Sequence, residues 1–139
     1  MDRLIRLVKE ENHSLAVLNG GVSTYDGRGV SDLFRLLTDG KQRLRGATVA
    51  DKVVGKGAAA LMISGGVSEV FALTISAPAL ALLDGAGIKT GYDVLVPNII
   101  NRAGTDICPV EKLCKDCRTA AECLPLIESF VNEKLQGKP

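Results

Sequence analysis

The thiol groups of this chain lie together near its C-terminus. All four cysteines fall between residues 108 and 123, namely Cys108, Cys114, Cys117 and Cys123. Thiolates bind Zn²⁺ and iron–sulfur clusters, and neighbouring thiols can form redox-active disulfides. Three interpretations are therefore open: a metal or cluster site made by all four, a redox pair (Cys114 with Cys117, or one of these with Cys123), and small buried apolar side chains.

Helical spacing indicates which of these thiols can meet. Cys114 and Cys117 are one helical turn apart, and Cys123 follows the Thr119–Glu122 spacing, which is typical of a capping box at a helix start. Cys108 lies about 9 Å along a helix axis from Cys114, so it reaches the other three only if the intervening segment is irregular. Three thiols can therefore converge where two C-terminal helices meet.

Cys108 has a second possible role, because it precedes Pro109 at a predicted helix start. A helix N-terminus lowers the pKa of a thiol and favours the nucleophilic thiolate. The nearby carboxylate of Glu111 opposes this effect. Cys108 is therefore the candidate nucleophile, and a plain capping residue is the alternative.

Composition limits the classes of protein to which the chain can belong. Its 139 residues are 46% hydrophobic with a net charge of +1, which predicts one domain over residues 1–139 with a cysteine-rich helical segment at about 106–136. A balanced charge and 4% aromatic residues give no reason to expect a nucleic-acid partner. The apolar runs are too short to span a membrane, and we expect a cytoplasmic protein.

The hydrophobic pattern alternates between helices and strands. Asn19 and Gly20 predict a tight hairpin, and Pro97 suggests that the strand before it ends there or lies at a sheet edge. Thr48 and Asp51 form a second capping-box spacing, which predicts a central helix over residues 49–62. The fold class is therefore α/β, a three-layer α/β/α sandwich with a mixed sheet. The other expected elements are helices over 1–12, 31–37 and 77–84, strands over 14–18, 22–25 and 67–75, a strand region over 92–100 that Pro97 interrupts, and two C-terminal helices separated at 118–119.

This order of elements resembles the cytidine deaminase-like fold. The run from Val49 to Ala60, the segment Ser76-Ala77-Pro78 and the turn Cys108-Pro109-Val110-Glu111 are similar to an uncharacterised bacterial family of that superfamily. The resemblance covers nearly the whole chain. It implies the fold and supplies no established reaction.

The chain departs from the zinc-dependent deaminases at each ligand position. Those enzymes carry His-Ala-Glu or Cys-Ala-Glu at the start of the central helix and Pro-Cys-x-x-Cys at the next helix start. Here the matching residues are Ala50-Asp51-Lys52, and then Ala79 and Leu82. The only histidine, His13, precedes the hairpin. Zinc-dependent deamination is not expected, and whether the chain is an enzyme stays open.

The resemblance still implies a pocket where two helix N-termini converge. Unpaired N–H groups at helix starts favour an anionic or carbonyl-bearing ligand, so we expect a small polar or nucleotide-like molecule bound by Lys52 and Ser76, with Asp51 and Cys108 as catalytic candidates. Asp51 could instead only cap its helix.

Two other functions remain as alternatives. One is a cysteine-based redox module, or a metal module whose cofactor is Zn²⁺ or an iron–sulfur cluster. The other is a non-catalytic subunit of a homo-oligomer that packs through exposed sheet edges or through the apolar helix around Ala77–Leu83.

Overall fold

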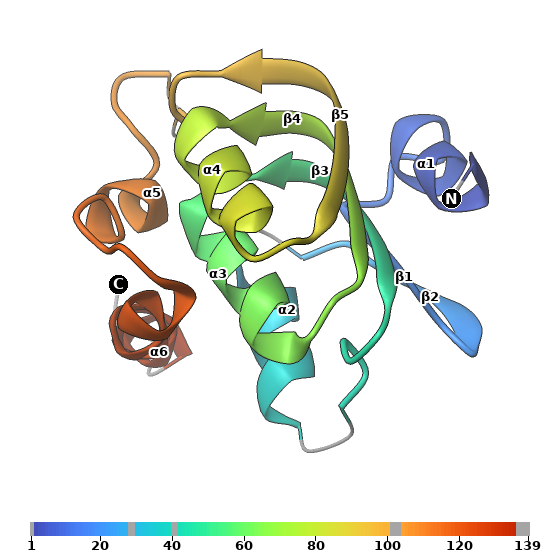
Figure 1. Cartoon of the computed structure of the whole chain (residues 1–139), viewed down its shortest axis with the longest axis horizontal. Helices are drawn as coiled ribbons and strands as arrows, with labels where there is room; N and C mark the ends of the chain where they lie inside the picture. Colours follow the sequence, from blue (N-terminus) through green and yellow to red (C-terminus); the bar gives the residue numbers. More distant parts are fainter. Residues whose placement is uncertain (1, 28–29, 40–41, 101–103, 136–139) are drawn as a thin grey trace.

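A computed structural model describes residues 2–27, 30–39, 42–100 and 104–135 of the chain (Figure 1). Its strands form one five-stranded sheet in the order β2-β1-β3-β4-β5. β1 is antiparallel to β2 and β3, whereas β3, β4 and β5 are parallel. The α/β class with a mixed sheet is therefore confirmed. The strands are β1 (Leu15–Asn19), β2 (Gly21–Tyr25), β3 (Thr48–Val54), β4 (Glu69–Ser76) and β5 (Lys89–Val96).

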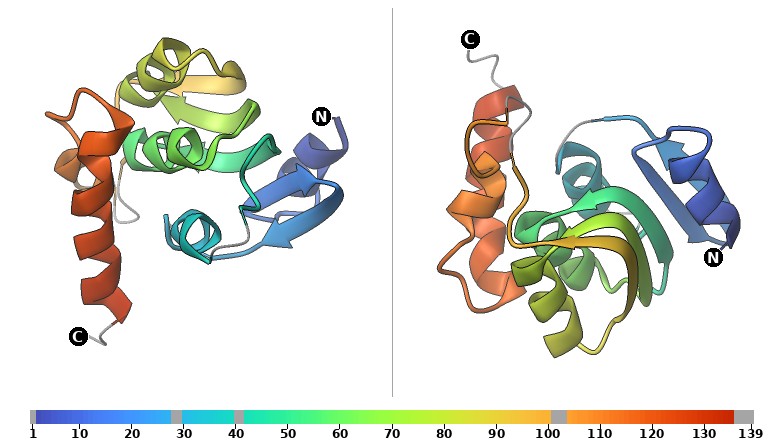
Figure 2. Two further views of the ribbon diagram at one scale, coloured as in Figure 1. Left: turned by 60° about the horizontal axis from the view of Figure 1, so that its bottom comes forward. Right: turned by 90° about the horizontal axis from the view of Figure 1, so that it is seen from above.

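Helices lie on both sides of this sheet. α1 packs on β1 and β3, whereas α3 packs against α2, α4 and α6. α5 and α6 lie at the opposite end of the molecule from α1 (Figure 2). The helices are α1 (Asp2–Lys9), α2 (Ser31–Thr38), α3 (Lys56–Gly65), α4 (Ala77–Gly85), α5 (Pro109–Leu113) and α6 (Ala120–Leu135).

The apolar side chains form two separate cores. The larger core fills the space between the sheet and α2, α3, α4 and α6, and the smaller one lies beneath α1. Leu4 and Val8 of α1 pack in the smaller core with Ala16 and Ala50. Both faces of the sheet centre are thus buried. In the described part of the chain, no helix has the length and apolarity needed to cross a membrane.

The central helix predicted over 49–62 is wrong in its first half. Residues 48–54 form β3, and α3 begins only at Lys56. Val49 belongs to the larger core and Ala50 to the smaller one, so consecutive side chains point to opposite faces, as in a strand. β-branched residues at 48, 49, 53 and 54 favour this outcome. The spacing of Thr48 and Asp51 is therefore not a capping box.

Most of the other predicted elements are confirmed with small shifts of their ends. Gly20 takes a φ of +79° at the hairpin turn, a conformation that favours glycine. β5 is an edge strand and ends just before Pro97. The Thr119 hydroxyl accepts from the backbone N of Glu122 at 3.3 Å, as the capping-box spacing predicts. The cysteine-rich segment is helical in α5 and α6, and its predicted last residue, 136, lies outside the described residues.

Candidate functional site

A buried carboxylate lies where α3 and α4 begin. Glu111, on α5, is only 3% exposed. Its Oε1 accepts hydrogen bonds from the backbone N of Lys56 at 2.6 Å and from the hydroxyl of Ser76 at 3.0 Å. Its Oε2 accepts from the backbone N of Ile99 at 2.5 Å. Three donors from three separate segments therefore converge on one carboxylate.

Glycines at the start of α3 allow α5 to come this close. A Cβ at Gly55 would lie 3.2 Å from Glu111 Oε1 and 3.2 Å from Ile99 Cγ1. A Cβ at Gly57 would lie 2.2 Å from Val110 Cγ1, a distance that no packed core permits. The sequence Gly55-Lys56-Gly57 is thus shaped for contact with α5.

Ser76 links the carboxylate to α4. It is fully buried and caps α4, accepting from the backbone N of Ala79 at 3.2 Å while donating to Glu111. Pro78 follows in the first turn, where a missing N–H costs nothing. The hydroxyl of Ser76 therefore uses both its donor and its acceptor capacity inside the protein.

Lys56 makes the reciprocal connection from α3 back to the end of α5. This side chain is also buried, and its Nζ donates to the carbonyl oxygens of Lys115 (3.2 Å) and Cys117. A carboxylate thus lies at the positive end of α3, and an ammonium group contacts carbonyls just after α5. We call these four residues, Lys56, Ser76, Ile99 and Glu111, the α3–α5 clasp. Among the described residues, no buried side-chain N or O atom lacks a hydrogen-bond partner.

Asp51 lies away from the clasp. It sits within β3, paired in register with Leu15 and Ala72, and is four residues before Gly55. That spacing corresponds to about 13 Å along a strand. The prediction that Asp51 begins the central helix beside Ser76 is therefore wrong, because the residues that precede Gly55 are extended.

The surroundings of Asp51 are nevertheless unusual. Burial raises the pKa of its carboxyl group to about 7, the backbone N–H groups of Val53 and Lys52 lower it in part, and the charge of Asp32 raises it further. A carboxyl group with such a pKa can exchange a proton near neutral pH. Its role as a catalytic residue stays a prediction.

Lys52 contacts neither the clasp nor the carboxyl group of Asp51 through its ammonium group. Its Nζ donates to the backbone carbonyl of Asn12 at 3.4 Å and to the side-chain oxygen of the same residue. It therefore ties β3 to the segment that follows α1. The structure does not bring Lys52 together with Ser76, because each is engaged by a different part of the chain.

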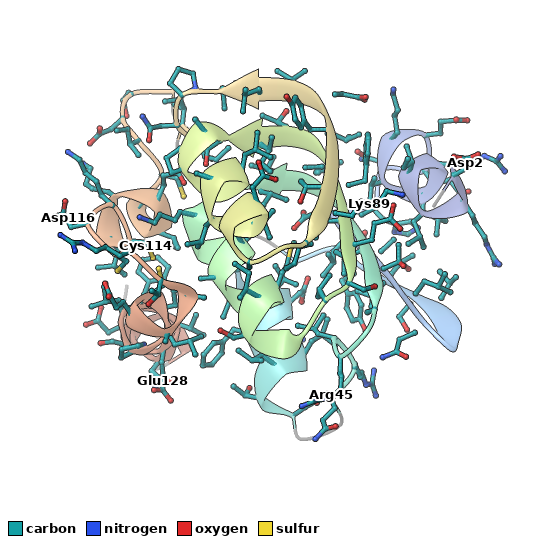
Figure 3. The ribbon with its side chains drawn as sticks, viewed as in Figure 1. Asp2, Arg45, Lys89, Cys114, Asp116 and Glu128 are labelled. Carbon is teal, nitrogen blue, oxygen red and sulfur yellow. The ribbon has the colours of Figure 1, made fainter. Side chains whose placement is uncertain are left out.

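The four thiols differ in environment. Cys108 is half-buried and precedes α5, whose five residues begin with Pro109. Cys114 and Cys123 are buried, and Cys117 is half-buried. All four pack in or against the larger core, with Cys114, labelled in Figure 3, at the end of α5. The close approach of Cys114, Cys117 and Cys123 stays a prediction. Burial raises the pKa of Cys114 and of Cys123.

Neither the cysteines nor the helix starts fit a bound metal ion. Within the described ranges, no group of three or more His, Cys, Asp or Glu side chains is arranged to hold one. The first residues of α3 and α4 include Lys56, Gly57 and Ala79, and none of these is a zinc ligand. The structure thus gives no support to the four-cysteine metal site, and its helix starts do not suit deaminase zinc chemistry.

Of the four clasp residues, the sequence singles out only Ser76, as a binding residue at a helix start. Glu111 enters the sequence analysis only as a charge near Cys108, and Lys56 is not singled out. A usable signal was present, since Lys56 is the one charged residue in the apolar stretch from Gly55 to Met62 and has glycine on both sides. A lysine in such surroundings is buried only with a partner.

Comparison with known proteins identifies a family without an assigned function. The family model described as "TM1506: Domain of unknown function (DUF1893)" matches residues 3–131. The crystal structure of a DUF1893 family protein (TM1506) from Thermotoga maritima superposes with a TM-score of 0.83 at 27% identity, covering 94% of this chain and 91% of that one. No curated protein matches the chain.

Proposed function

The chain belongs to the DUF1893 family, and we propose that it is a zinc-free protein of the cytidine deaminase-like type that binds a small polar ligand at the starts of α3 and α4. The strand order supports the fold assignment, together with helices that directly follow the parallel strands β3 and β4. The ligand would carry a carboxylate or phosphate group, as nucleotides do.

One observation carries this proposal, namely the convergence of three donors on the carboxylate of Glu111. A backbone N–H at a helix start, such as that of Lys56, binds phosphates and carboxylates in many proteins, and here a second backbone N–H and a serine hydroxyl join it. Glu111 supplies the anion from within the chain. An external anion would have to replace it, so Glu111 acts as an internal competitor.

This competition defines the ligand's chemistry. The ligand must offer at least two acceptor oxygens, because Lys56 and Ser76 contact one oxygen of Glu111 and Ile99 contacts the other. A neutral nucleoside lacks such a group, whereas a nucleoside monophosphate has one. The phosphate, and not the base, is therefore the part that the clasp recognises.

The test is a binding titration of the full chain by calorimetry. The probes are inorganic phosphate, adenosine monophosphate and adenosine, and the proteins are the wild type, Glu111→Gln and Glu111→Ala. We expect the two phosphate probes, and not adenosine, to bind Glu111→Ala at least tenfold more tightly than the wild type. Adding Ser76→Ala to that variant should reverse the gain. Failure of both phosphate probes to bind any of these proteins would refute the proposal, and Glu111→Gln keeps the test available if Glu111→Ala does not fold.

A second candidate function is that of a homo-oligomeric subunit, which the exposed edge of the sheet favours. Tyr92, Val94 and Leu95 on β5 are 41%, 50% and 46% exposed. An exposed apolar edge strand can pair with the same strand of a second copy. In an antiparallel pair centred on Gly91, Lys89 of each copy would face Asp93 of the other, which joins opposite charges.

Light scattering tests this second candidate. We expect a dimer for the wild type and a monomer for Val94→Lys. Val53→Lys is the matched control, because Val53 is similarly exposed at 46% but lies on β3, inside the sheet. A monomeric wild-type chain at high concentration would rule out this mode of assembly.

A further inference from the structure

The carboxylate of Glu111 is closed off from solvent in the structure. Glu111 is only 3% exposed, and the donors that surround it belong to Lys56, Ser76 and Ile99. An external anion therefore reaches these donors only after Glu111 has moved away. Because Glu111 lies on α5, the helix must move with it.

α5 has few apolar contacts to hold it on the core. Its buried residues are Val110 and Glu111, whereas Leu113 is 38% exposed. Cys114, which ends the helix, is fully buried. Two small apolar side chains give a short helix little attachment, because the free energy of burial scales with the apolar area removed from water. The hydrogen bonds of the clasp therefore supply much of the attachment of α5.

A single residue of α3 contacts both ends of the stretch from Glu111 to Cys117. The backbone N of Lys56 donates to Glu111 Oε1, and its Nζ donates to the backbone carbonyls of Lys115 and Cys117. Loss of the contact with Lys56 thus releases this stretch at both ends together. Such a stretch can open as one unit while the rest of the domain stays folded.

α6 does not depend on α5 to stay in place. Its start is capped by its own neighbours, since the Thr119 hydroxyl accepts from the backbone N of Glu122, and the Glu122 carboxylate accepts from the backbone N of Arg118. Ile127 and Val131 of α6 are buried in the larger core, where the helix packs on α3. The boundary between a movable and a fixed segment therefore lies just before α6.

We propose that α5 and the turn after it, residues 109–117, form a lid over the anion site, and that this lid opens while α6 stays docked on α3. The inference rests on the ligand binding proposed above, because it concerns access to the same site. α5 lies at the outer side of α3 (Figure 1), so it can leave without displacing the sheet. A bound anion and Glu111 need the same donors, so an anion in the site holds the lid open.

Two buried thiols report on the two helices separately. Cys114 at the end of α5 and Cys123 on α6 are both 0% exposed. The full chain carries Cys108→Ser and Cys117→Ser, which remove the half-buried thiols and keep the backbone carbonyl of residue 117 that accepts from Lys56. Iodoacetamide labels the remaining thiols.

Mass spectrometry of tryptic peptides follows the two labelling rates. Trypsin cuts after Lys115 and Arg118, so Cys114 and Cys123 fall on separate peptides. A buried thiol reacts only while its segment is open. We expect Cys114 to react about tenfold faster than Cys123 or more, and its rate to respond weakly to low urea, whereas the rate of Cys123 should rise steeply because the core must unfold.

Two variants distinguish the opening of the lid from global unfolding. Glu111→Gln weakens the clasp, so it should raise the labelling rate of Cys114 about tenfold or more. Val8→Ala weakens the smaller core beneath α1, at the opposite end of the molecule from α5 (Figure 2). It should raise the rate of Cys123 and leave that of Cys114 unchanged. Equal rates for the two thiols, or an equal response of both to Val8→Ala, would overturn the lid.

Inorganic phosphate connects the lid to the ligand. We expect phosphate to speed the labelling of Cys114 until the site is saturated, because it occupies the donors that Glu111 leaves. Early labelling of Cys114 without any binding of phosphate in calorimetry would uphold the movement of α5 and count against the proposed ligand. Phosphate that binds without changing the rate of Cys114 would show that access does not require α5 to move, and would refute the lid.

Discussion

Removing the carboxylate of Glu111 gives the sharpest test of the clasp as a structural element. In Glu111→Ala the backbone N of Lys56 and the hydroxyl of Ser76 lose a buried acceptor, and Ile99 loses a partly buried one. Each buried donor left unpaired costs about 1–3 kcal/mol. We expect a total loss of about 3–5 kcal/mol in the free energy of unfolding, a large part of the roughly 5–15 kcal/mol typical of a domain.

Glu111→Gln separates charge from hydrogen bonding. The amide oxygen can still accept from Lys56 and Ser76, but the amide nitrogen would face the N–H of Ile99. One bond is lost and two remain, so the expected loss is about 2 kcal/mol. The order of stability should therefore be wild type, then Gln, then Ala.

Urea unfolding followed by circular dichroism measures these differences, since the chain has no tryptophan. The matched control is Glu122→Gln. That carboxylate also accepts from a backbone N, of Arg118 at 2.9 Å, but in an exposed position, and its loss should cost less than 1 kcal/mol. If Glu111→Ala unfolds within 1 kcal/mol of the wild type at an unchanged m value, the clasp does not hold α5 on the core.

Three further predictions concern single positions. Asp51→Asn should raise the free energy of unfolding at pH 8 by about 2 kcal/mol. Burial raises the pKa of Asp51 to about 7, so the folded wild-type protein loses stability as pH rises from about 4 through 7. Unfolding measured at pH 4 and pH 8 should show a flatter pH dependence for Asp51→Asn and not for the exposed control Asp84→Asn. Gly57→Ala should lower the free energy of unfolding by about 1–3 kcal/mol, because its methyl group would overlap α5. The control Gly85→Ala meets nothing within 4 Å and should raise the free energy of unfolding by up to about 1 kcal/mol. Equal effects of the two variants in thermal unfolding would contradict the close approach of α3 and α5. Ser76→Ala should lower stability by about 1–2 kcal/mol through loss of a helix cap and of a bond to the buried carboxylate, and a neutral result in urea would show that water replaces the hydroxyl.

Local sequence signals were sufficient wherever neighbours along the chain decide the conformation. The Asn19-Gly20 turn, the Pro78 start of α4 and the Thr119–Glu122 cap each depend on backbone angles and bonds within a few residues.

The same local reasoning failed at β3. The spacing of Thr48 and Asp51 fits a helix cap, yet this segment lies between β1 and β4, and its side chains are buried on both faces. Pairing with two strands distant in sequence outweighs a local pattern of moderate strength. The position of Asp51, and hence its distance from Ser76, follows from that pairing.

What the sequence alone determined is the α/β class, the hairpin and the starts of α2, α4 and α6. Only the tertiary structure decided that Glu111 and Lys56 are buried, and that each satisfies backbone groups more than fifty residues away in the chain. The sequence around a charged side chain does not show whether that side chain is buried, because a buried charge is stable only when distant segments supply its hydrogen-bond partners.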